Sequence, residues 1–68
     1  MDLNEEEWAV IDHLCTTGFH ENIGYLKAYI VDDIETLYGL EDKGLIRSFA
    51  NNQAFELTKK GKDMCETI

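Results

Sequence analysis

The sequence predicts one small α+β domain, mainly helical, with three helices, a two-stranded β-hairpin and a C-terminal helix, in that order. Apolar residues recur at three- and four-residue spacing in three separate segments, which is typical of helices packed on a core. Two short apolar segments then flank a polar turn, as in a hairpin. The chain has 68 residues, enough for one domain and too few for two, so we expect a single domain over residues 1–68.

The charge of the chain restricts its partners. Asp and Glu number 14 and Lys and Arg number 6, which gives a formal net charge of -8. Such a surface repels polyanions at long range, so nucleic acid and anionic membranes are disfavoured. No apolar run has the length that a membrane span needs, and no signal peptide is recognisable. We therefore expect a cytoplasmic protein without membrane contact.

The two cysteines, Cys15 and Cys65, stand far apart and form no CxxC motif. Small disulfide-stabilised domains usually carry a denser set of cysteines, so the sequence favours two reduced, half-buried thiols. A cross-link between Cys15 and Cys65 is the alternative, because the terminal helices of such folds often pack together.

No arrangement of residues is typical of an enzyme. The sequence has no nucleophile with a recognisable base and acid, no glycine-rich phosphate loop and no convincing pair of carboxylates. His13, Cys15 and His20 suggest metal ligands, but His13 and Cys15 are two residues apart on a helix and point to different sides. We predict no enzymatic activity, no cofactor and no metal site.

The first helix is expected over residues 4–17. Asn4 can cap it, and Glu7 can return the hydrogen bond in a capping box. Gly18 suits the left-handed position that ends a helix. The apolar stripe of this helix consists of Trp8, Val10, Ile11, Leu14 and Cys15.

The second helix, expected over residues 21–30, is the weakest of these predictions. Gly24 lowers its helix propensity, and the run of Tyr29, Ile30 and Val31 would suit a strand as well. Tertiary packing has to decide between the two.

The third helix is expected to begin after Asp32 or Asp33, either of which can cap it, and to end at Gly44. Gly39 in its middle indicates either close packing against another helix, which we favour slightly, or a weak position that the helix tolerates. The buried stripe consists of Ile34, Leu37 and Leu40, with Tyr38 at its edge.

Two strands are expected over residues 45–49 and 54–58, joined by the polar turn 50–53. Thr58 can cap a last helix from Lys59 to about Ile68. Met64, Cys65 and Ile68 can then fold back on the first helix.

The order of these elements, together with the phrases LYGLEDKGLIRSF and FELTKKG, resembles the winged helix-turn-helix domains of MarR, PadR and ArsR-type regulators. The resemblance covers about residues 4–64. Its most specific parts are Leu40 followed by Gly44, and Leu57-Thr58 followed by Gly61. The resemblance implies that the third helix lies in the DNA major groove and that the hairpin forms a wing on the backbone.

The third helix, however, carries acids where phosphate contact requires Lys or Arg. We therefore expect a protein-interaction or regulatory module whose third helix and nearby tyrosine meet a basic protein surface. A sharper version is a nucleic-acid mimic that inhibits a basic partner. The expected partner-binding residues are Asp33, Glu35, Thr36, Tyr38 and Asp42.

The alternative is a DNA-binding transcriptional regulator of the winged-helix type, and a homodimer is compatible with either hypothesis. The nucleic-acid contacts would then be Arg47, Asn51, Asn52, Lys59, Lys60 and Lys62. The aromatic residues leave a second question open. They either fill the core or form an exposed protein-binding patch, and this concerns Phe19, Tyr25, Tyr29 and Tyr38.

Overall fold

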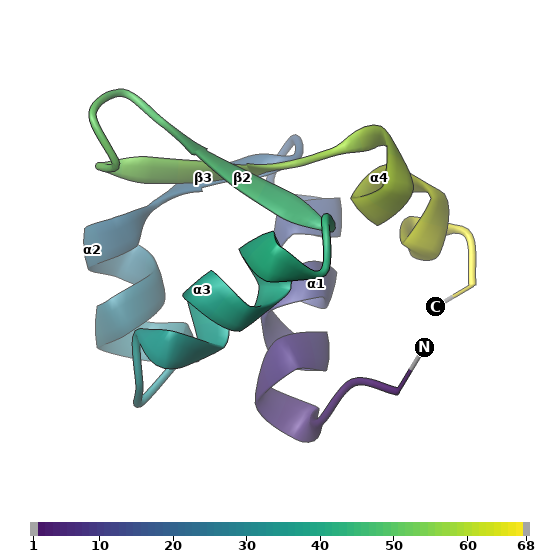
Figure 1. The fold of residues 1–68 in the computed structure, drawn as a ribbon, viewed down its shortest axis with the longest axis horizontal. Coiled ribbons are helices and arrows are strands. Elements are labelled where there is room, and N and C mark those ends of the chain that lie inside the picture. Colours follow the sequence, from purple (N-terminus) through teal and green to yellow (C-terminus); the bar gives the residue numbers. More distant parts are fainter. Residues whose placement is uncertain (1, 68) are drawn as a thin grey trace.

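The computed structural model describes residues 2–67, which form a small α+β domain of helices and a three-stranded antiparallel sheet. The elements in chain order are α1 (Glu5–Thr16), β1 (His20–Asn22), α2 (Ile23–Tyr25), the π-helix η1 (Leu26–Ile30), α3 (Glu35–Asp42), β2 (Ile46–Phe49), β3 (Ala54–Leu57) and α4 (Lys59–Cys65). The sheet lies across one side of the domain, with α1, α2 and α3 beneath it and α4 at one end (Figure 1). No helix within residues 2–67 is long and apolar enough to cross a membrane.

Helix α1 agrees with the sequence prediction. The Asn4 side chain accepts a hydrogen bond from the Glu7 backbone N–H, and the Glu7 carboxylate accepts one from the Asn4 N–H, which completes the capping box. Gly18 follows the helix with φ +80°, as a left-handed terminating glycine should. The cap therefore fixes where α1 begins, and the apolar stripe of the helix faces the core.

The sheet contains a strand that the sequence analysis missed. β3 is central, with β2 on one side and β1 on the other. His20 pairs with Glu56 and Asn22 with Ala54, in the stretch where the start of a helix was predicted. The three residues form a strand because the outer edge of β3 would otherwise leave its backbone groups without partners.

The second helix is correspondingly shorter than predicted and changes its geometry. One turn, α2, continues as η1, where the Val31 N–H donates to the Leu26 carbonyl at 2.8 Å, a five-residue spacing. Leu26 is fully buried, whereas Tyr25 and Tyr29 are exposed. The choice between helix and strand that the sequence left open is thus decided by packing. The segment is helical, and the buried Leu26 anchors it to the core.

Helix α3 begins slightly later than expected, although Asp33 does accept a hydrogen bond from the Glu35 N–H at 2.9 Å. Gly44, with φ +77°, ends it as predicted. The expected close packing at Gly39 is not required, because a Cβ there would lie 3.9 Å from the Glu7 carboxylate, an ordinary contact. Leu37 is fully buried, so α3 still faces the core.

The core lies between the sheet and the helices. Its members come from every part of the described chain, and the fully or almost fully buried apolar residues are Val10, Ile11, Leu14, Leu26, Val31, Leu37, Leu40, Leu45, Ile46, Phe55 and Leu57. Each helix and each of β2 and β3 contributes to a single cluster or packs on it.

The hairpin and α4 form as predicted, with bounds that differ by a few residues. The hairpin loop has positive φ at Ala50, Asn51 and Asn52. Thr58 caps α4 by accepting from the Gly61 N–H at 3.1 Å. Gly61 is buried so closely against the Leu45 carbonyl that an added Cβ would overlap it. α4 ends at Cys65, and the predicted contribution of Ile68 lies outside the described residues.

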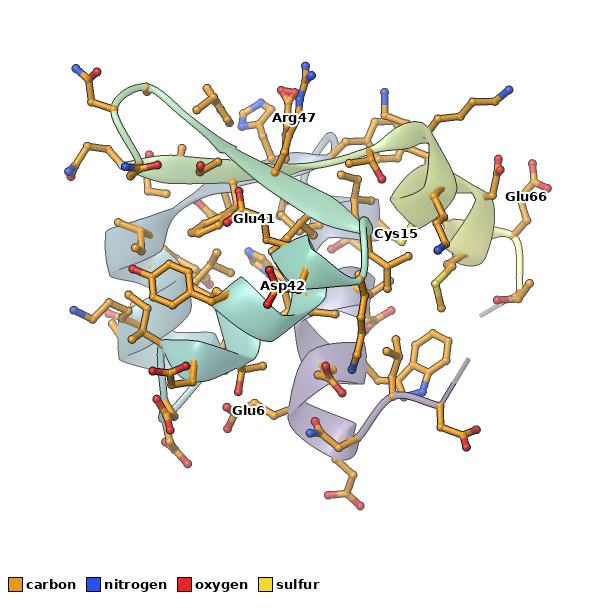
Figure 2. The ribbon with its side chains drawn as sticks, viewed as in Figure 1. Glu6, Cys15, Glu41, Asp42, Arg47 and Glu66 are labelled. Carbon is orange, nitrogen blue, oxygen red and sulfur yellow. A yellow bond between two sulfur atoms is a disulfide. The ribbon has the colours of Figure 1, made fainter. Side chains whose placement is uncertain are left out.

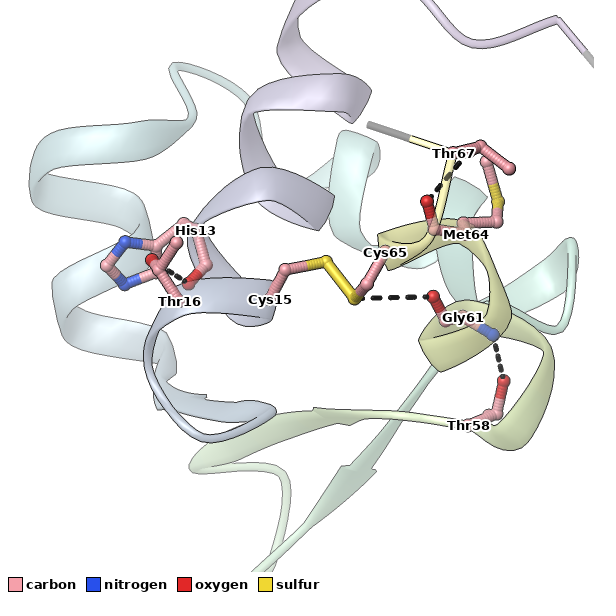
Figure 3. The surroundings of a disulfide bond; sticks show 8 residues. All are labelled: His13, Cys15, Thr16, Thr58, Gly61, Met64, Cys65 and Thr67. Atoms are coloured by element: carbon pink, nitrogen blue, oxygen red, sulfur yellow. Dashed lines mark hydrogen bonds between the residues drawn. A yellow bond between two sulfur atoms is a disulfide. The ribbon is translucent and has the colours of Figure 1, made fainter.

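The two cysteines form a disulfide, which corrects the expectation of reduced thiols (Figure 3). Cys15 on α1 and Cys65 on α4 have Cα atoms 5.7 Å apart and a sequence separation of 50. The bond forms because α4 folds back along α1, as the alternative in the sequence analysis assumed. It closes the chain from the end of α1 to the end of α4 into one covalent loop.

Candidate protein-interaction surface

The acidic surface of α3 is built from side chains that the fold leaves uncompensated. Asp33, Glu35 and Asp42 are all exposed. Among the ion pairs of residues 2–67 none involves these three carboxylates. Asp42 points away from the core on the near side of α3 (Figure 2). These three residues, which we call the α3 acids, project negative charge from the helix.

Glu41, next to Asp42, serves the fold instead. Its carboxylate accepts hydrogen bonds from the Ser48 backbone N–H at 3.1 Å and from the Ser48 hydroxyl at 3.2 Å. This contact joins α3 to β2 and fixes the orientation of the helix against the sheet. Glu41 is half-buried, so it adds negative charge beneath the α3 acids without being a free contact itself.

The one lysine at the end of α3 does not neutralise this surface. Lys43 turns inward and forms an ion pair with Glu7 of α1. Glu7 is only 6% exposed, and the bond from Lys43, with a further one from the Asn4 backbone, lowers its pKa despite burial. The positive charge of Lys43 is therefore used to compensate a buried carboxylate in α1.

Thr36, which was expected to contact a partner, has its hydroxyl engaged within the domain. It donates a hydrogen bond to the Glu6 carboxylate at 2.6 Å, and the Asp32 backbone N–H donates to the other carboxylate oxygen at 3.3 Å. The bond from Thr36 is the main cause of the lowered pKa of Glu6. Thr36 thus ties α3 to α1, and Glu6 adds an ionised carboxylate beside it (Figure 2).

The tyrosines lie on the surface, which answers the question that the sequence left open. Tyr25 is 43% exposed, Tyr29 is 74% exposed and Tyr38 is 46% exposed. Tyr38 lies on α3 with the acids, whereas the other two lie on α2 and η1. Phe19 and Phe49 are also partly exposed, at 39% each. Exposed aromatic rings beside charged groups are common in protein interfaces.

Most of the basic residues proposed for nucleic acid already have partners. Arg47, at the sheet, pairs with Glu56 at 3.2 Å (Figure 2). Lys60 donates to the Lys43 carbonyl at 3.2 Å, and the Lys62 ammonium lies 5.1 Å from the centre of the Phe19 ring. Lys59 is exposed on α4, and Asn51 and Asn52 are exposed at the tip of the hairpin. These residues lie on the sheet and α4, and none of them lies on α3.

Two shallow hollows flank Trp8 on the side of α1 and α4. One, of about 490 Å³, is lined by Trp8, Ala9, Asp12 and Thr67. The other, of about 480 Å³, is lined by Trp8, Lys60, Asp63, Met64 and Thr67. Neither brings together a nucleophile, a base and an orienting acid. Within residues 2–67 no three His, Cys, Asp or Glu side chains are grouped so that they could hold a metal ion.

A second cluster, which the sequence analysis did not identify, joins α1 to α2. The His13 imidazole bonds to the Glu21 carboxylate through Nε2 at 2.8 Å and stacks on the Tyr25 ring. The bond from His13 is the main cause of the lowered pKa of Glu21. The four-residue spacing of Tyr25 and Tyr29 was a usable signal for a shared face, but nothing in the sequence placed His13 against it.

Comparison of the chain with models of known protein families, with curated proteins and with solved structures gives no match.

Proposed function

We propose that this chain is a winged-helix protein that acts as a protein-interaction module and uses α3 to meet a basic surface of its partner. The winged-helix assignment is supported by the order of elements, in which α1, β1, the α2–η1 helix and α3 precede a hairpin. It is also supported by the sheet order β1-β3-β2 and by the resemblance of the segments before Gly44 and Gly61 to winged helices. The α3 acids and Tyr38 form the contact surface.

One observation carries this proposal: three exposed carboxylates, Asp33 just before α3 and Glu35 and Asp42 on it, form no ion pair within residues 2–67, while Lys43 at the end of α3 is turned into the domain. Two unit charges about 4 Å apart interact by roughly 1 kcal/mol even in a water-like dielectric. In a DNA groove the α3 acids would meet phosphates, and each contact of this kind would oppose binding. Against Lys or Arg of a partner protein the same contacts are favourable.

The alternative, a DNA-binding regulator, depends on basic residues of the sheet and of α4, of which Lys60 reaches the Lys43 carbonyl at the end of α3. Affinity for a duplex requires that several phosphates be neutralised. Arg47 has an acidic partner, Glu56, and the remaining bases of the set are the three exposed lysines of α4, Lys59, Lys60 and Lys62. A net charge of -8 adds a long-range repulsion. We therefore favour the protein-interaction hypothesis.

A nucleic-acid mimic is the sharper form of the same proposal. In this form the carboxylates of α3 take the place of phosphates on the surface of a basic, nucleic-acid-binding partner. Glu6 and Glu41 add charge next to the α3 acids and are held in place by Thr36 and Ser48. Fixed carboxylates suit such a role, because less side-chain entropy is lost when the partner binds.

Two NMR titrations of the isotope-labelled chain at low salt test the proposal. One uses a peptide of alternating Lys and Gly, and the other uses a mixed-sequence DNA duplex of similar length. The proposal expects the peptide to shift the backbone amides of α3 and the Tyr38 ring, and the duplex to leave them unchanged. Shifts of α3 and of the hairpin by the duplex, with none by the peptide, would instead support the DNA-binding alternative.

A further inference from the structure

Three aromatic rings form a continuous strip on the surface of α1, α2 and η1. The ring centres of His13 and Tyr25 are 5.0 Å apart and the rings are nearly parallel, at 13°. The ring centres of Tyr25 and Tyr29 are 4.8 Å apart, with the rings tilted by 47°. We call these three residues the aromatic strip. It lies on other elements than the α3 acids and is not needed for their contact.

The strip is held in place before any partner binds. The bond between His13 and Glu21 fixes the imidazole ring, and this ring in turn supports Tyr25. The helix that carries both tyrosines is anchored by Leu26, which is fully buried. A surface that is already ordered loses little conformational entropy on binding. The tyrosines contribute little to the core, since Tyr29 remains 74% exposed.

The charges around the strip favour a cation. Glu21 lies at the His13 end, and Asp32 follows Ile30, the last residue of η1, by two positions. The one base of this helix, Lys27, is two residues from each tyrosine and therefore points to the other side. The faces of tyrosine rings attract cations through their quadrupole. The strip thus offers aromatic faces with a carboxylate at its His13 end and an acidic residue, Asp32, shortly after η1 in the sequence.

We propose that the aromatic strip binds an arginine side chain of the partner, with the guanidinium stacked on Tyr25 and Tyr29. The inference rests on the proposed function, which gives the kind of partner, a basic protein segment. It adds that the strip selects arginine among the basic residues of that segment. Arginine fits better than lysine because its guanidinium is planar, stacks on rings and is more weakly hydrated than an ammonium group. Nucleic-acid bases also stack on rings, but their phosphates would be repelled by the net charge of -8.

The experiment compares two peptides that differ only in their basic residue, alternating Arg-Gly and alternating Lys-Gly, by calorimetry and NMR. If only the weakly hydrated guanidinium stacks on the rings, the whole energy of an exposed cation–π contact appears as a preference, and the wild-type chain should bind the arginine peptide about two- to fivefold more tightly than the lysine peptide. Tyr29→Leu should remove this preference, and Tyr29→Phe should keep it. Phe49→Leu is the control, because it removes a partly exposed aromatic ring on β2, outside both the strip and the contact surface of α3, and should leave the preference unchanged.

The ratio of the two peptide affinities tests the aromatic strip, whereas the affinity for the lysine peptide tests the α3 acids. Charge changes on α3 should weaken both peptides equally and leave their ratio intact, so either proposal can fail alone. On the wild-type chain, the arginine side-chain protons should move upfield through the ring currents of the tyrosines. Equal affinity for the two peptides, or a preference that persists in Tyr29→Leu, would overturn the inference. So would a stronger response of the Tyr29 ring to a single-stranded oligonucleotide than to the arginine peptide.

Discussion

Removal of the Cys15–Cys65 disulfide should cost a large part of the stability of the domain. The bond closes a loop with a sequence separation of 50 residues. In the chain-entropy description, a loop of this size restricts the unfolded state by about 4 kcal/mol. A domain of this length has a total stability of roughly 3–10 kcal/mol. The double variant Cys15→Ala, Cys65→Ala should therefore remain folded only marginally.

Urea unfolding, followed through Trp8 fluorescence, measures this loss. Trp8 is the only tryptophan of the chain and lines the hollow beside Met64 of α4, so it reports on the contact between the two helices. The wild-type chain in the presence of a dithiol reductant should unfold at the same urea concentration as the alanine variant. If the free energy of unfolding falls by less than about 1 kcal/mol in both the alanine variant and the reduced wild-type chain, the reasoning that this cross-link stabilises the domain is refuted.

The packing and the carboxylates give two further predictions. Gly61→Ala should lower the free energy of unfolding by about 2–3 kcal/mol in urea titrations, because the added Cβ would overlap the Leu45 carbonyl; Gly24→Ala, with open space around it, should not destabilise the domain. The lowered pKa values of Glu6, Glu7 and Glu21 mean that the unfolded chain binds more protons, so their contribution is present above about pH 4.5 and is lost as the pH falls through the folded values. Glu7→Gln should make this acid dependence shallower, and an unchanged pH profile would contradict the assigned role of the Lys43 bond.

The elements that follow from local chemistry could be predicted from the sequence. The capping box of α1, the Thr58 cap of α4 and the left-handed Gly44 each depend on residues within a few positions of one another. The buried stripes of α1 and α3 follow from helical spacing in the same way. These local signals were enough to predict the order of the helices and the hairpin along the chain.

The features that the sequence did not reveal all depend on distant partners. His20–Asn22 becomes a strand because β3, more than thirty residues later, offers it an open edge. The disulfide requires that α4 return to α1, and the hydrogen bond between Glu6 and Thr36 requires that α1 and α3 be adjacent. For the candidate site, the exposed α3 acids were visible in the sequence. The inward turn of Lys43 and the stacking of His13 on Tyr25 were not.

The central claim, that the α3 acids bind a basic partner, is tested most directly with two variants of equal charge change. One carries Asp33→Asn, Glu35→Lys and Asp42→Lys, where the first substitution removes a charge but keeps a side-chain oxygen for the hydrogen bond from the Glu35 N–H. The matched control carries Asp12→Asn, Asp63→Lys and Glu66→Lys, which are exposed positions on α1, on α4 and directly after α4.

The measurement is the affinity of each variant for the lysine peptide by calorimetry at one fixed salt concentration. Loss of two close ion pairs at about 1 kcal/mol each predicts a decrease of at least about tenfold for the α3 variant. The control should lose only the long-range share of the attraction, about two- to threefold. Equal losses in the two variants would show that net charge alone attracts the peptide and would contradict a binding surface on α3.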